Sequence, residues 1–148
     1  MLRRAHIVTI VAVVTAVSVC AATPDGSTKA KAIPLKQRDP QKAVEEEMAW
    51  MMKLYHYTPL LALRDRVVEE VGKVKAGKKS TNRSAGWGHA TVDHHGHLIS
   101  EWWFNTPHGK RTVYFDTSTL INTPGEVARQ ESARADYMGR MAPTLKVQ

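Results

Sequence analysis

The chain has 148 residues, one cysteine and a formal net charge of +7. This length fits one domain, and one cysteine excludes the disulfide framework that stabilises many small secreted folds. The basic balance favours a partner protein or another acidic macromolecule. The positive charges are dispersed among Asp and Glu without a long basic run, so a dedicated nucleic-acid role is not expected.

The first 22 residues have the composition of a targeting segment. Arg3 and Arg4 precede an apolar run, residues 7–22, and no acidic residue occurs before Asp25. A positive start followed by an apolar stretch that ends in small residues is typical of a secretory signal peptide. We therefore expect residues 1–22 to be a signal peptide and the protein to be secreted or periplasmic. The alternative is a membrane anchor through residues 7–22, the one case in which a membrane partner is expected.

The segment after the apolar run differs in composition from the rest of the chain. Residues 23–38 contain Pro, Gly, Ser, Thr and Lys with few apolar side chains, which predicts a flexible leader. The remaining residues, 39–148, are expected to form a single small α+β domain.

Two helices are predicted at the start of this domain. Asp39-Pro40 combines an N-cap acceptor with a proline at the first helical position. Apolar residues then recur on one helical face as far as Tyr55. Thr58-Pro59 repeats the capping signal, so the first helix should end near His56 and a second should run from Pro59 to about Ala76.

The sequence beyond a break at residues 77–86 is rich in β-branched and aromatic residues. Residues 88–93, 97–104 and 110–117 predict three strands joined by two short loops that contain glycine. We expect a three-stranded antiparallel meander in which the run 102–104 faces the run 113–115. Thr123-Pro124-Gly125-Glu126 is a capping box that opens a last helix to about Met141. The predicted fold is thus a helical pair, a three-stranded antiparallel meander and a C-terminal helix.

Aromatic side chains on the predicted strands form the first candidate site. Adjacent residues of a strand point to opposite faces, so either Trp102 or Trp103 should leave the side that the helices cover. An exposed tryptophan can anchor a partner. The predicted binding surface consists of Trp87, Trp102, Trp103 and Tyr114.

Histidines concentrated at the first hairpin form a second candidate site. Neutral imidazoles suit zinc or copper, and the candidate ligands are His89, Asp93, His94, His95 and His97. The competing interpretation is a polar hairpin with exposed histidines and no cofactor.

Two basic pairs that follow a glycine suggest another class of function. Gly77-Lys78-Lys79 and Gly109-Lys110-Arg111 resemble the sites at which secreted precursors are cut and their products amidated. The products would end at Ala76 and His108. The competing interpretation is structural, because glycine ends helices and forms hairpin turns.

The sequence contains no nucleophile elbow, phosphate-binding loop or paired-carboxylate motif. We therefore expect a non-enzymatic protein that acts by binding another macromolecule, as an interaction, inhibitor or accessory protein. The alternatives are the precursor of amidated peptides and an exported protein that binds a transition metal through its hairpin.

Overall fold

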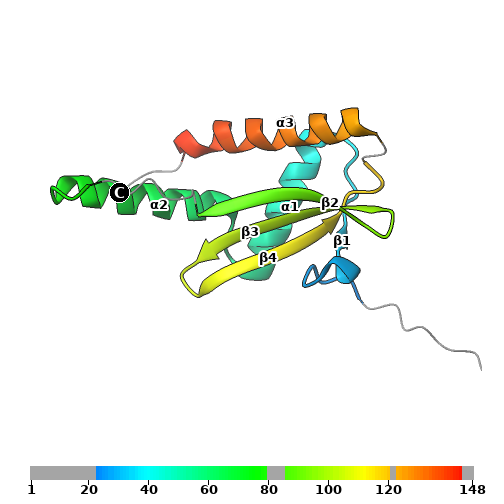
Figure 1. Ribbon diagram of the computed structural model, residues 1–148, viewed down its shortest axis with the longest axis horizontal. Helices are drawn as coiled ribbons and strands as arrows, with labels where there is room; N and C mark the ends of the chain where they lie inside the picture. Colours follow the sequence, from blue (N-terminus) through cyan, green and yellow to red (C-terminus); the bar gives the residue numbers. More distant parts are fainter. Residues whose placement is uncertain (1–22, 80–85, 121–122, 145–148) are drawn as a thin grey trace, which may run out of the picture.

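The computed structural model describes residues 23–79, 86–120 and 123–144 and has an α+β fold (Figure 1). The described residues form three α-helices and a mixed sheet of four strands in the order β1-β4-β3-β2. The residues predicted to be a signal peptide lie outside the described part of the chain. Within that part, no helix is long and apolar enough to cross a membrane.

The two predicted N-terminal helices are present with the expected caps. Helix α1 spans Pro40–Tyr55, and the carboxylate of Asp39 accepts a hydrogen bond from the Lys42 amide at 3.0 Å. It ends at His56, which adopts a left-handed conformation with φ 52°. Helix α2 spans Pro59–Lys75 with Thr58 as its N-cap. In Figure 1 the two helices run in different directions, as an L-shaped pair.

Helix α3 spans Pro124–Met141 and begins with the predicted capping box. The Thr123 hydroxyl accepts from the Glu126 amide at 3.3 Å, and the Glu126 carboxylate accepts from the Thr123 amide at 3.0 Å. This reciprocal pair satisfies two amide groups that a helix start leaves open.

The predicted antiparallel meander is confirmed as three of the four strands. Strand β2 spans Trp87–His94, β3 spans His97–Thr106 and β4 spans Gly109–Asp116. The expected pairing of the two aromatic runs is correct only for Trp102 and Val113. Trp103 pairs with Thr112 and Phe104 with Arg111, whereas Tyr114 and Phe115 pair with Glu101 and Ser100. The short turn at Gly109 fixes this register, because loop length determines which residues of a hairpin face each other.

The segment 23–38, expected to be a flexible leader, contributes to the sheet and the core. Strand β1, Ile33–Pro34, pairs in parallel with the end of β4, and the Leu35 amide donates to the Asp116 carbonyl at 3.1 Å. Ile33 and Leu35 are 2% and 3% exposed. Two apolar residues around a proline are too few to show a strand period in the sequence.

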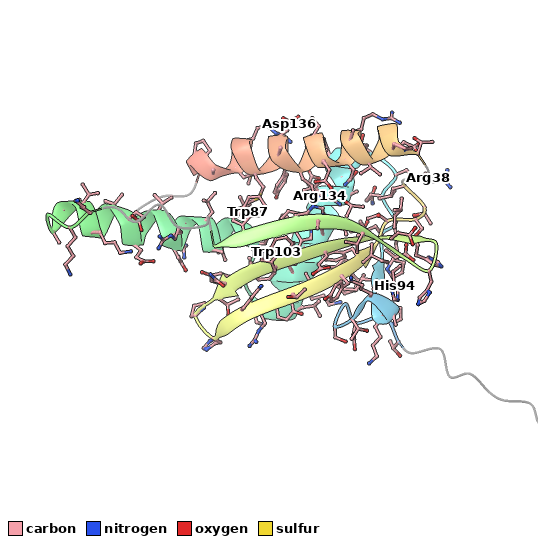
Figure 2. All side chains as sticks on the ribbon, in the orientation of Figure 1. Arg38, Trp87, His94, Trp103, Arg134 and Asp136 are labelled. Atoms are coloured by element: carbon pink, nitrogen blue, oxygen red, sulfur yellow. The ribbon has the colours of Figure 1, made fainter. Side chains whose placement is uncertain are left out.

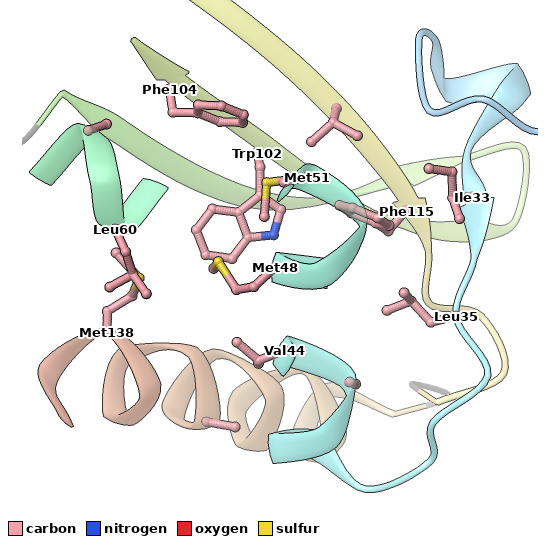
Figure 3. Close-up of a cluster of buried hydrophobic side chains, with 14 residues drawn as sticks. Ile33, Leu35, Val44, Met48, Met51, Leu60, Trp102, Phe104, Phe115 and Met138 are labelled. Atoms are coloured by element: carbon pink, nitrogen blue, oxygen red, sulfur yellow. The ribbon is translucent and has the colours of Figure 1, made fainter. Parts of the chain in front are cut away.

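The core lies between the sheet and the helices. Helices α1 and α3 pack against each other and against one face of the sheet, and the start of α2 closes one end (Figure 3). The largest apolar side chains buried in this core are Trp102, Phe104, Phe115 and Met51. The burial of these side chains between the sheet and the helices thus provides stability that disulfides provide in many small secreted folds.

Candidate functional site

Alternation along the strands divides the side chains of the meander between two faces of the sheet. Trp102 and Phe104 point to the helices and are buried, whereas Glu101 and Trp103 point the other way and are partly exposed. Figure 1 shows no α-helix of the described chain on this second face. We call it the outer face, and by register it carries Gly88, Ala90, Val92, Ile99, Glu101, Trp103, Thr112 and Tyr114.

Trp103 lies across the neighbouring strand on the outer face. A Cβ atom at Gly88 would come within 2.2 Å of Cζ2 of the indole, so only glycine leaves room for the ring. The Lys110 ammonium nitrogen is 6.0 Å from the ring centroid, at the limit of a cation–π contact. The ring is therefore held against the sheet while part of it remains accessible.

Tyr114 and Glu101 are paired across β3 and β4 next to Trp103. Lys29, from the short 3-10 helix Lys29–Lys31, approaches Glu101 to 3.7 Å between Nζ and Oε2. Partial burial, with a smaller contribution from the Glu101 charge, raises the pKa of the Tyr114 hydroxyl. The outer face thus combines two aromatic rings with one ion pair, Lys29–Glu101, and the positive charge of Lys110.

The structure does not bring the four predicted surface aromatics together. Trp103 and Tyr114 share the outer face, but Trp102 is fully buried and its indole N–H donates to Glu47 Oε2 at 3.1 Å. Its prediction as a surface residue is therefore wrong, because its place in the strand turns it toward the helices. Trp87 lies on the same inner side, with its ring centroid 5.7 Å from that of Trp102.

The histidine-rich hairpin is spread over separate environments. His89 points to the helices, whereas His95 is exposed in the turn, where its φ of 54° and that of Gly96, 80°, form a tight hairpin. His97 is exposed, with Nδ1 3.2 Å from Asp116 Oδ2. Among the described residues, no group of three His, Cys, Asp or Glu side chains is placed to hold a metal ion.

The inner face contains a buried polar network that the sequence analysis missed. Glu47 of α1 is 0% exposed and Arg134 of α3 is 3% exposed. Figure 2 shows Arg134 between α3 and the sheet. The guanidinium donates to both carboxylate oxygens, with Nη2–Oε1 at 2.9 Å and Nε–Oε2 at 3.2 Å. The Ser100 hydroxyl also donates to Glu47 Oε1, at 2.7 Å. With the indole N–H of Trp102, four hydrogen bonds compensate for burying this carboxylate.

His89 extends this network toward α3. Its Nε2 is 2.9 Å from Ser100 Oγ, and its Nδ1 is 3.2 Å from Glu131 Oε2. The Ser100 proton lies toward Glu47, since a carboxylate can only accept, so the hydroxyl oxygen accepts from His89 and from Arg134. A Ser–His–Glu series normally suggests a nucleophile. Here the serine is 0% exposed and its proton is already donated elsewhere, so the arrangement is structural.

A sequence signal for this network exists in the helix pattern. Glu47 stands three residues after Val44 and four before Met51, on the apolar stripe of α1. Arg134 occupies the equivalent place on α3, four residues after Gln130 and four before Met138. Two opposite charges on the buried stripes of two helices indicate that the charged side chains form an ion pair and that the helices pack together.

The two basic pairs lie at structural glycines. Gly77 follows the end of α2 with φ 69°, and its amide donates to the Val74 carbonyl at 3.0 Å. Gly109 has φ 104° at the start of β4, so Lys110 and Arg111 are residues of a paired strand.

No protein-family model, curated protein or solved structure matches this chain. Fold and site therefore define its class: a small α+β protein with one sheet face covered by helices and one face that carries accessible aromatic side chains.

Proposed function

We propose that this protein is a small exported, non-enzymatic binding protein that docks onto a partner protein through the outer face of its sheet. The observation that carries the proposal is the placement of Trp103. An indole held over Gly88 on the sheet face that no described α-helix covers is a rigid apolar anchor, and tryptophan is among the residues most enriched at the centres of interfaces.

The surroundings of Trp103 support a protein partner. Tyr114 adds a second amphipathic ring, and Lys110 adds a positive charge beside the indole. A few aromatic anchors within a polar border are the usual anatomy of a protein–protein interface. The net charge of +7 favours a partner with an acidic surface.

The test is a photo-crosslinking amino acid at Thr112, which pairs with Trp103 on the outer face. Full-length protein produced in its native host should give one crosslinked protein species. Trp103→Ala should reduce that species at least tenfold and leave the thermal melt nearly unchanged.

The matched control is Trp50→Ala. Trp50 is also a partly exposed tryptophan next to a lysine, with Lys53 Nζ 4.5 Å from the ring centroid, but it lies on α1. This variant should keep the crosslink. An equal loss in both variants, or an unchanged crosslink in Trp103→Ala, would overturn the proposal.

A further inference from the structure

The C-terminal half of α2 exposes a row of valines. The buried residues of this helix are confined to its first turn, and Figure 1 shows the helix projecting beyond the sheet. Val67, Val68 and Val71 are 42%, 40% and 37% exposed, and Val74 is 61% exposed. Positions 67, 71 and 74 have the spacing of one helical face, so the projecting part of α2 carries an apolar stripe.

Charges of both signs occur along α2 as far as Lys73, and only basic residues follow. Asp65 lies in the first half, and Glu69 and Glu70 lie just past the midpoint, where Arg66 contacts both at 2.7 Å each and Lys73 contacts Glu69 at 2.6 Å. After Glu70, residues 71–79 contain four lysines and no acidic residue. Among the described residues, the ion pairs of the helix therefore end at Lys73, and residues 74–79 carry only positive charges.

The lysines at the end of α2 are exposed to solvent. Gly77 adopts φ 69°, and the Lys78 amide closes the last turn on the Lys73 carbonyl at 2.9 Å. Lys75, Lys78 and Lys79 are exposed around Val74. Long lysine side chains that flank an apolar stripe can extend to a polar layer while the stripe lies deeper.

A second copy of the chain does not suit this surface. Four partly exposed valines offer at most a few hundred Å², whereas a stable dimer buries about 800 Å² per partner. In a parallel pairing the two basic tips would also repel each other. The occupant should instead be negatively charged and apolar just beneath its surface.

We propose that the C-terminal half of α2, defined by Val67, Val71, Val74 and the lysines at 75, 78 and 79, binds an anionic membrane surface. The lysines contact phosphate groups of the lipids, and the valines enter the boundary of the acyl layer. An apolar stripe beside a cluster of lysines is the pattern of helices that lie on anionic membranes. This surface is on a different element from the outer face, so its test is independent of the proposed function.

A fluorescent probe at position 74 tests the proposal. The full chain carrying Cys20→Ser and Val74→Cys is labelled with an environment-sensitive dye and mixed with vesicles of phosphatidylcholine alone or with one quarter phosphatidylglycerol. We expect a blue shift with the anionic vesicles only. The same dye at the exposed position of Ala135→Cys on α3 reports on a distant helix and should not shift.

Charge variants separate a local effect from net charge. Lys75→Glu, Lys78→Glu and Lys79→Glu together should weaken vesicle binding at least tenfold. Lys36→Glu, Arg38→Glu and Lys42→Glu make the same change in net charge at exposed positions elsewhere and should have little effect.

Three results would overturn the proposal. The first is no shift at position 74 with anionic vesicles, and the second is an equal loss of binding in both triple variants. The third is a shift of the same size with soluble polyglutamate, which would assign the tip of α2 to an acidic polypeptide. Circular dichroism melts of all variants show whether a loss of binding reflects unfolding.

Discussion

Glu47 and Arg134 form a buried ion pair that joins α1 to α3. Removing one partner of such a pair leaves an uncompensated buried charge and costs about 3–5 kcal/mol. We expect Glu47→Gln to lower the free energy of unfolding by this amount, measured by urea denaturation. Glu45→Gln makes the same charge change at an exposed position of the same helix and should stay within about 0.5 kcal/mol of the wild type. Equal stability of both variants would contradict a structural role for the pair.

The ionisation of Glu131 makes the stability of the protein depend on pH. Contact with His89, aided by the Thr91 hydroxyl at 2.7 Å, lowers the pKa of Glu131 to about 2 against the opposing effect of burial. An unfolded glutamate titrates near pH 4.3. The stabilisation is therefore complete above about pH 4.3 and is lost as the pH falls toward 2.

Glu131→Gln should remove this component of the acid dependence. We expect the urea midpoint of the variant to fall less than that of the wild type between pH 4.5 and pH 2.5. The side chain of Glu131 is 44% exposed, so solvent screening keeps the difference modest. Parallel pH profiles for the two proteins would contradict the assignment.

Among the elements, the contact between β2 and β3 at Gly88 makes the outer face possible. A methyl group there would collide with the Trp103 ring, so Gly88→Ala should lower the free energy of unfolding by about 1–3 kcal/mol. In a Trp103→Ala background the same change should cost little. Denaturant titrations of the four proteins form a double-mutant cycle, and additive effects would show that the ring does not lie on Gly88.

The sequence predicted the elements that have strong local signals and missed those that depend on distant contacts. Thr58-Pro59 and Thr123-Pro124 mark helix starts within a few residues, and the structure has both. Strand β1 has only two residues, and its pairing with β4 joins segments about 80 positions apart. Local periodicity carries no information about such a partner.

In the candidate site, too, local signals were predictable from the sequence and tertiary contacts were not. The alternation rule predicted that Trp102 and Trp103 separate, and they do. Which of them is buried depends on the face that α1 and α3 cover, and this follows from tertiary packing. Glu47 was not among the predicted site residues, although its spacing from Val44 and Met51 already placed it on the buried stripe.

At the level of the whole molecule, the N-terminal segment determines where the folded domain begins. Ile33 and Leu35 lie in the core, and the Tyr114 amide of β4 donates to the Gly26 carbonyl at 3.0 Å. Segment 25–35 thus covers the edge of β4 and adds two apolar side chains beneath it. Exposed strand edges promote aggregation, so this cover also protects the sheet.

A chain that begins at Asp39 should therefore fail to fold as a stable unit. Losing two buried aliphatic residues costs about 2–5 kcal/mol each, which is comparable to the whole stability of a small domain. We expect the chain starting at Thr23 to give a cooperative thermal melt and the chain starting at Asp39 to give none.

Leu35→Ala in the longer chain should lower the melting temperature without abolishing cooperativity. This variant separates the loss of one side-chain contact from the loss of the whole strand. Equal melts of the two chains would place the boundary of the domain at Asp39 after all and leave residues 23–38 as a leader.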